Sequence, residues 1–202
     1  MQIPNVLRII ENIRTIVSHF KSNNANEKLI TYQQNNTGRQ ALKLIHDIPT
    51  RNSTYAMLEL FALLEESLKA TIALIDKHLP VLSSEDWKII RELIQVLKPF
   101  QSLTKTMSGE KYATASLINL LEIDLKNVCN ILLKKSFCKE VQQVIQCYLT
   151  SIQERFRSLE QSTTLMVCTI IDPRFKMLAF SDKQISENAK EKVITLVASS
   201  QP

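Results

Sequence analysis

Turn-forming residues are scarce in this chain, and that scarcity constrains its fold more than any other feature. Of 202 residues, only Gly38 and Gly109 are glycine and six are proline. A sandwich or barrel of many strands needs a turn about every 8–12 residues, which these residues cannot supply. Hydrophobic residues make up 45% of the chain, enough to bury a core in one domain or two small ones. The sequence therefore predicts a globular, soluble and mainly α protein, a multi-helix bundle.

Apolar residues recur at spacings of three and four along most of the chain, the pattern of a helix with one buried face. Ser83 precedes the acidic pair Glu85 and Asp86, as at a capped helix start. Pro99 interrupts the stripe that follows, so we expect that helix to kink or restart there before ending at Gly109. The predicted helices cover residues 4–21, 25–34, 54–79, 85–109, 117–132, 137–156 and 185–197. The pair at 117–132 and 137–156 is expected to pack as a hairpin.

Two apolar stretches are not assigned by helical periodicity. Residues 42–48 form a short apolar run that Pro49 closes, and the residue before a proline is pushed toward extended backbone. We therefore predict one short strand there. Residues 165–171, which end before Asp172, fit either a buried helix end or a short strand, and periodicity does not decide between them.

The charge of the chain is concentrated near its start. The formal net charge is +5, and residues 1–52 contribute +4 of it through seven Lys or Arg and three acids. Such an excess favours a polyanionic partner such as nucleic acid. An ordinary solvated surface accounts for the same charge, and it is the commoner explanation.

The cysteine and histidine pattern does not indicate a metal site. The four cysteines include no Cys-x-x-Cys pair, and the chain has only three histidines. We expect no metal and no cofactor. The sequence also lacks a signal segment and an apolar run long enough for a membrane span, so it predicts a reducing intracellular compartment with free thiols.

Three segments of the chain carry a family resemblance. Residues 43–51 read Lys-Leu-Ile-His-Asp-Ile-Pro-Thr-Arg and continue into Asn-Ser-Thr-Tyr-Ala-Met-Leu-Glu, and residues 171–176 read Ile-Asp-Pro-Arg-Phe-Lys. Between them, residues 87–116 are similar to a helical insertion. Together these segments resemble the hAT transposase superfamily, in particular BED-type zinc-finger transposases and the host proteins domesticated from them. The resemblance covers roughly residues 6–180.

The resemblance implies a domain organisation and the absence of catalysis. Family transposases have a ribonuclease-H-like core in which two aspartates and a glutamate hold divalent metal, and a helical insertion interrupts it. Residues 1–52 would be a remnant of this core, 53–180 the helical insertion, and 181–202 a C-terminal helix before the family's dimerisation region. The three acids would lie outside residues 1–202. We therefore expect no transposase activity, and homo-oligomers only through the dimerisation region.

The same resemblance implies candidate DNA contacts. Family members carry a tryptophan after the Thr-Arg pair, which resembles a stacking residue for a distorted base, whereas this chain has Asn52 at that position. Lys43 and Arg51 flank the predicted strand and can neutralise phosphate. Lys43, Arg51 and Asn52 are thus the candidate DNA contacts, and a solvated surface is the alternative.

Other residues are expected to be structural. Asp47 and Asp172 each precede a proline motif with an arginine nearby and could hold metal, but turn capping and pairing with arginine is the favoured interpretation. Pro173 and Arg174 complete the turn motif of Asp172. Trp87, the single tryptophan, is expected to anchor the core rather than to stack on a ligand.

The sequence therefore predicts a nuclear, non-catalytic protein derived from an hAT transposase, which contacts DNA or serves as a scaffold in transcriptional regulation. One alternative is a protein-interaction module of a BED-type regulator linked to transcription or SUMO modification. Another is a decayed transposase fragment without function. The expected partners are DNA and other nuclear proteins, and no membrane.

Overall fold

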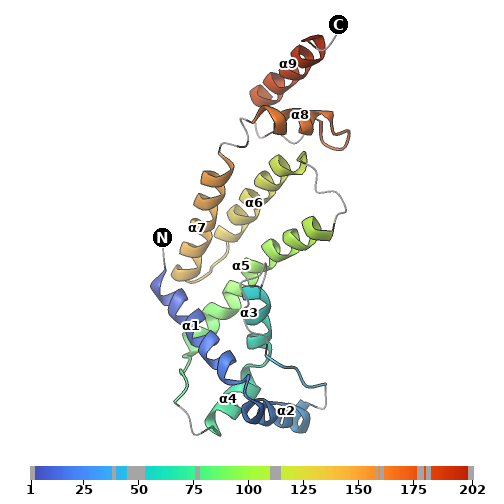
Figure 1. Ribbon diagram of the computed structural model, residues 1–202. Coiled ribbons are helices and arrows are strands. Elements are labelled where there is room, and N and C mark those ends of the chain that lie inside the picture. The colour runs from blue at the N-terminus through green and yellow to red at the C-terminus, as the bar shows by residue number, and fades with distance from the viewer. Residues whose placement is uncertain are drawn as a thin grey trace. The chain divides into compact units, whose positions relative to one another are not determined.

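All regular secondary structure among the described residues is helical (Figure 1). The structure is a computed structural model, and it describes residues 3–37, 40–44, 53–75, 78–109, 115–157, 159, 162–176, 180 and 183–199. These ranges contain nine helices and no strand. The helices are α1 (Pro4–His19), α2 (Asn23–Thr37), α3 (Ser53–Leu63), α4 (Glu65–Ala73), α5 (Ser84–Gly109), α6 (Leu117–Leu133), α7 (Lys139–Phe156), α8 (Thr163–Ile171) and α9 (Lys183–Ser199).

The mainly α prediction is confirmed, and one detail of it is wrong. The helix predicted over 54–79 is two helices, because the backbone at Leu64 leaves helical geometry with φ −96° and ψ 14°. Backbone hydrogen bonds flank the break, since Leu64 N donates to Leu60 O and Leu68 N donates to Leu64 O. The apolar stripe also continues across Leu64, so the sequence pattern gives no sign of the break. Of the two alternatives at Pro99, a restart is excluded, because α5 is one helix through that residue, and a kink stays a prediction.

The two undecided apolar stretches are resolved in part. Residues 163–171 form helix α8, so the strand alternative for 165–171 is wrong. Residues 42–44, the described part of the predicted strand, are neither helix nor strand, and residues 45–48 lie outside the described residues. None of the helices in the described ranges has the length and apolar character needed to cross a membrane.

The chain divides into two compact units. The first is Met1–Thr104 with Phe137–Gln143, and the second is Lys105–Ser136 with Val144–Pro202. The boundaries after Thr104 and Gln143 fall inside α5 and α7, and the boundary after Ser136 falls in the loop between α6 and α7. The division drawn from the family resemblance, at residues 52 and 180, stays a prediction.

The core of the first unit is built on α1 and on the aromatic pair of α3 and α5. Ile9, Ile13 and Ile16 lie on one face of α1 and are at most 1% exposed. Phe61 of α3 stacks on Trp87 of α5, with ring centroids 5.2 Å apart and 13° between the planes. Stacking of this kind adds to the gain from area burial. α2 packs against α4.

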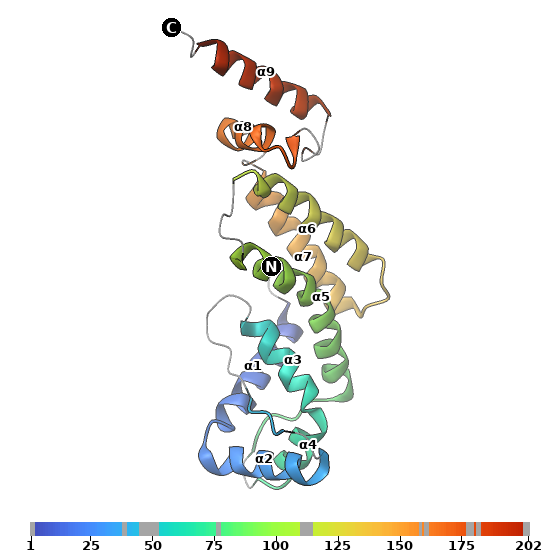
Figure 2. The same ribbon diagram turned by 90° about the vertical axis from the view of Figure 1, so that its right-hand side faces the viewer.

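The second unit contains a helical hairpin. α6 and residues 144–156 of α7 lie side by side in both views of the ribbon (Figures 1 and 2). Cys129 and Leu132 of α6 and Ile145 of α7 are buried. Burial raises the pKa of Tyr148 on α7, and the Cys129 thiol adds to that shift, as expected where the two helices touch. α8 packs against both α6 and α9.

Candidate functional site

A buried glutamine of α2 holds the segment that carries the first candidate DNA contact. Ala25, Leu29 and Gln33 follow one another at intervals of four on the buried face of α2. Gln33 is 4% exposed, and a buried amide needs hydrogen-bond partners. Its Nε2 donates to Leu42 O at 2.9 Å, and its Oε1 accepts from Leu42 N at 2.9 Å. We call this pair of bonds the Gln33–Leu42 clamp.

Lys43 follows directly after the clamp and is exposed. The other two candidate DNA contacts, Arg51 and Asn52, lie outside the described residues, as does Asp47. Lys43 is therefore the candidate contact that the structure places. The segment that contains Lys43 is bonded to α2 through the backbone of Leu42.

Further lysines of the basic first quarter are exposed on the same unit. Lys21 follows α1, and Lys28 lies on α2. The exposed Glu27 beside Lys28 reduces the local positive charge. The exposed charge of this region is thus a modest positive excess.

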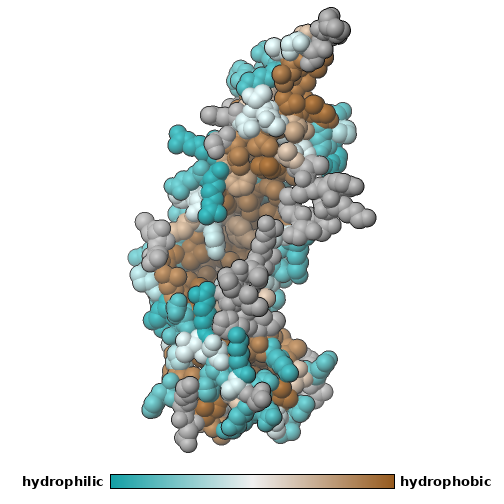
Figure 3. Space-filling model, viewed as in Figure 1, coloured by the Kyte–Doolittle hydropathy of each residue, from teal (hydrophilic) through white to brown (hydrophobic). Residues whose placement is uncertain are grey.

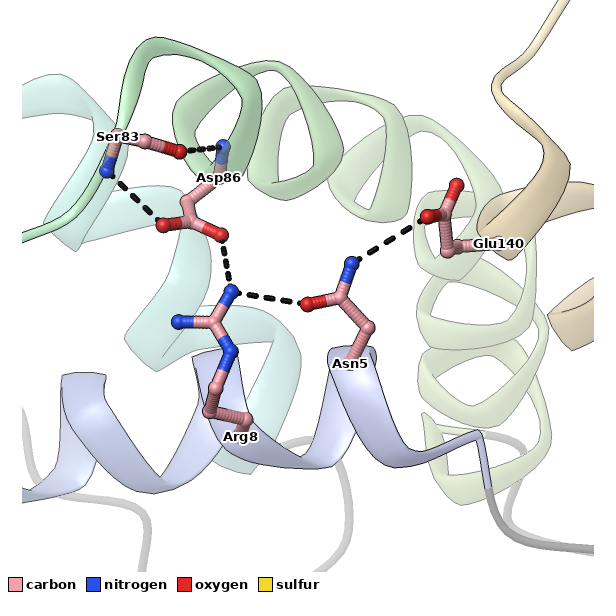
Figure 4. Close-up of polar contacts among 5 residues, drawn as sticks. All are labelled: Asn5, Arg8, Ser83, Asp86 and Glu140. Atoms are coloured by element: carbon pink, nitrogen blue, oxygen red, sulfur yellow. Dashed lines mark hydrogen bonds and ion pairs between the residues drawn. The ribbon is translucent and has the colours of Figure 1, made fainter.

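Arg8 of α1 is committed to a structural network at the start of α5 (Figure 4). Ser83 Oγ accepts from Asp86 N at 3.1 Å, and Asp86 Oδ2 accepts from Ser83 N at 2.9 Å, which is a reciprocal helix cap. Arg8 Nη2 donates to Asp86 Oδ1 at 2.6 Å and to Asn5 Oδ1 at 2.8 Å. Asn5 Nδ2 in turn donates to Glu140 Oε1 at 3.3 Å. These bonds join α1 to the starts of α5 and α7 within the first unit.

The electrostatics of Asp86 follow from this network. Burial works to raise the pKa of Asp86, but the hydrogen bonds from Ser83 and Arg8 outweigh it and the net pKa is lowered. The carboxylate is thus held in its charged form. A count of charges alone would place Arg8 on the basic surface of the first quarter. In the structure Arg8 instead forms an ion pair with Asp86.

Another carboxylate, Glu92 of α5, caps α7. Glu92 is 8% exposed, and its Oε2 accepts from Cys138 N at 2.8 Å, directly before the first residue of α7. Negative charge is favourable at a helix N-terminus, where backbone N–H groups are unpaired. The contact attaches the first turn of α7 to the first unit, and the segment Phe137–Gln143 accordingly belongs to that unit.

In the second unit, Asp172 organises the turn after α8. Its carboxylate accepts from Arg174 N and Nε at 3.0 Å each and from Arg174 Nη2 at 2.9 Å. Ser116 Oγ, which precedes α6, donates to Asp172 Oδ2 at 2.6 Å. The bonds from Arg174 and then Ser116 hold the pKa of Asp172 well below its usual range. The Arg174 guanidinium also lies 4.9 Å over the Phe175 ring, and Pro173 beside it is exposed.

Trp87 lies in the core of the first unit beside a small pocket. It is 3% exposed, and Lys69 Nζ lies 5.1 Å from its ring centroid. Lys69 also pairs with Glu65 at 2.6 Å. The pocket measures about 130 Å³ and its lining is mostly apolar: Ile16, Phe61, Lys69, Ile72, Pro80, Val81, Leu82 and Trp87.

Sequence reasoning missed Gln33, although a signal for it was present. Gln33 occupies the position after Ala25 and Leu29 in the buried register of α2, where an apolar side chain is expected. A polar residue in a buried stripe indicates that the fold supplies a partner. Across the residues that the structure describes, no group of three or more His, Cys, Asp or Glu is placed to hold a metal ion.

The sequence of the chain is similar to those of transposase-related proteins. Residues 2–96 match the family model described as the ZBED1 RNase-like helical domain. This match covers most of the first unit, including the clamp and the network around Asp86 apart from Glu140.

Two curated relatives cover more of the chain. It is 28% identical over 183 residues to the Putative AC transposase of Zea mays, a match that covers 84% of this chain and 21% of that protein. It is 22% identical over 194 residues to Zinc finger BED domain-containing protein 4 of Homo sapiens, covering 93% of this chain and 16% of that protein. The chain thus spans only a minor part of the length of each relative. The resemblance to hAT transposases and BED-type zinc-finger proteins is thereby confirmed. No solved structure matches the chain.

Proposed function

We propose that this chain is a non-catalytic helical module of an hAT-derived nuclear protein and that its first unit contacts DNA phosphate through Lys43. The observation that carries the proposal is the exposed Lys43 on a segment attached to α2 by the Gln33–Leu42 clamp. A cation on a fixed segment gains from phosphate contact through counterion release. The similarity to a protein named a transposase supports a DNA partner.

The non-catalytic part of the proposal is supported by how the buried carboxylates are used. Asp86 is bonded to Ser83 and Arg8, and Glu92 to the start of α7. Glu122 on α6 pairs with Lys126. Each of these groups has a structural partner, whereas metal-assisted cleavage of DNA needs carboxylates that converge on an ion. Metal-dependent cleavage or strand transfer by the purified chain would refute this part.

DNA contact is tested by measuring affinity for duplex and hairpin DNA over a range of salt concentrations. For Lys43→Ala we expect weaker binding and a log–log salt slope smaller by about one, because one phosphate contact is lost. Arg51→Ala tests the second candidate in the same way. Lys190→Ala, which removes an exposed lysine of α9 in the second unit, is the matched control and should leave the slope unchanged. No binding by the wild-type chain at low salt would refute DNA contact.

A protein-interaction role is the second candidate, and the surface of α9 favours it. Ile194, Leu196 and Val197 are 58%, 47% and 59% exposed, and apolar colouring appears on the part of the surface that α9 forms (Figure 3). Exposed apolar residues gathered on one helix are suited to contact with another protein. Partners that remain bound after nuclease treatment would support this role, and loss of every partner after that treatment would exclude it.

A further inference from the structure

The Gln33–Leu42 clamp uses both backbone polar groups of a single residue. Leu42 N–H and Leu42 C=O are each bonded to the Gln33 side chain at 2.9 Å. The amide of a glutamine can offer a donor and an acceptor together, as the backbone of a neighbouring strand does. It therefore replaces a strand partner for this one residue, although the segment is not part of a sheet.

The position of the clamp restricts the residue that follows it. Because both sides of Leu42 are bonded, the backbone leading into Lys43 has less freedom than that of an untethered loop. Gln33 is 4% exposed and anchored in α2, so the fixed point belongs to the core of the first unit. A flexible segment has to be ordered when its lysine meets a phosphate, and that ordering weakens binding.

We propose that Gln33 is a positioning residue for DNA phosphate: it holds the backbone at Leu42 so that Lys43 is presented in a bound-like arrangement before DNA arrives. This inference rests on the proposed DNA contact of Lys43. It assigns a role to a residue that would itself touch no DNA. The ligand is the phosphate backbone of duplex DNA, independent of base sequence.

The two roles have different signatures in a salt titration. Lys43→Ala removes a cation, so it lowers the salt slope by about 0.9. Gln33→Met keeps the size and neutrality of the side chain but removes both bonds of the clamp. We expect Gln33→Met to weaken binding to a short mixed-sequence duplex about fivefold at every salt concentration, because one more residue must be ordered when DNA binds. The salt slope should stay unchanged, because Lys43 still contacts the same phosphate. Gln34→Met, the exposed neighbour, is the matched control and should bind like wild type.

The clamp itself is measured without DNA, by hydrogen exchange at the Leu42 amide. Its protection should fall in Gln33→Met and stay unchanged in Gln34→Met. Gln33→Glu provides a second variant: a protonated carboxyl can both donate and accept, whereas a carboxylate can only accept. A carboxylate still accepts from Leu42 N–H, but it cannot donate to Leu42 C=O and repels that oxygen, so ionisation should open the clamp. The protection factor at Leu42, corrected for intrinsic exchange, should therefore rise as the pH is lowered through the pKa of that carboxyl.

The outcomes separate this inference from the proposed function. If wild type binds DNA and Gln33→Met loses Leu42 protection but keeps full affinity, positioning by Gln33 is refuted and the DNA contact stands. A reduced salt slope in Gln33→Met would also refute it, because the phosphate contact itself would then be lost. If wild type binds no DNA, both proposals fail, and the exchange data show whether the clamp exists as a structural contact alone. Reduced affinity at constant slope, together with lost protection, supports positioning.

Discussion

Asp86 in the first unit and Asp172 in the second have similar partners but make different kinds of contact. Each carboxylate accepts hydrogen bonds from an arginine and a serine. Arg174 is two residues from Asp172, whereas Arg8 is 78 residues from Asp86. The serines are placed the other way round, since Ser83 is 3 residues from Asp86 and Ser116 is 56 residues from Asp172. The ion pair with arginine is therefore local at Asp172 and tertiary at Asp86.

The comparison predicts that the first unit depends strongly on contacts between distant residues. Phe61→Ala removes a fully buried ring from its stack on Trp87, and we expect the free energy of unfolding of the first unit to fall by about 3–5 kcal/mol. Urea titration followed by the fluorescence of Trp87, the single tryptophan, reports on this unit. Leu63→Ala, at a position 68% exposed, is the control and should change stability little. Equal effects of the two variants would contradict the assigned core.

Asp86→Ala tests the tertiary version of the carboxylate contact. It removes the helix cap to Ser83 and the ion pair to Arg8, and we expect a loss of about 1–2 kcal/mol in the same measurement. Glu85→Ala changes an exposed acid of the same first turn and should cost about 0.5 kcal/mol or less. If Glu85→Ala lowered the free energy of unfolding as much as Asp86→Ala, the effect would come from negative charge near the helix N-terminus and not from the hydrogen bonds of Asp86.

Asp172→Ala tests the local version. We expect faster hydrogen exchange at the Arg174 amide, which loses its acceptor, and a smaller loss of stability than for Asp86→Ala. The urea transition followed by Trp87 should be unchanged, because that residue belongs to the first unit. A shift of that transition as large as the shift for Asp86→Ala would show that the turn is not a local feature.

The smallest expected effect is a pH dependence at Asp86. Its pKa is lowered in the folded protein, so its charge contributes stability above the unfolded pKa of about 3.9, and this contribution is lost as the pH falls through the folded value. The difference in unfolding free energy between wild type and Asp86→Asn should therefore be constant from neutral pH to about 5 and shrink at lower pH. A difference that instead grew on acidification would reverse the sign of the assigned shift.

Helix positions were predictable from the sequence where the stripe and its boundaries are local. The start of α5 follows from Ser83 and the acids after it, and its end from Gly109. The break at Leu64 was not predictable, because the apolar stripe in the sequence continues across it and only the backbone angles of the structure show it. Whether α8 was helix or strand also required the structure, since its short apolar run fits both.

The candidate site was predictable only in part. Lys43 followed from the family resemblance, and the structure adds its exposure. The attachment of its segment through Gln33 was not predicted. It requires the chain after α2 to turn back so that Leu42, nine residues after Gln33, meets the Gln33 side chain. Arg8 shows the opposite error, since a charge count includes it in the basic surface while the fold commits it to Asp86.

The sequence by itself determined the helical class of this protein, most helix boundaries and the resemblance to hAT and BED-type proteins. These features depend on periodicity, caps and short motifs, which act over a few neighbouring residues. Only the tertiary structure decided which polar groups are buried and which partners they meet, as for Gln33 with Leu42 and Arg8 with Asp86. A buried amide or charge is stable where a partner is present, and the path of the chain through space determines where that partner lies.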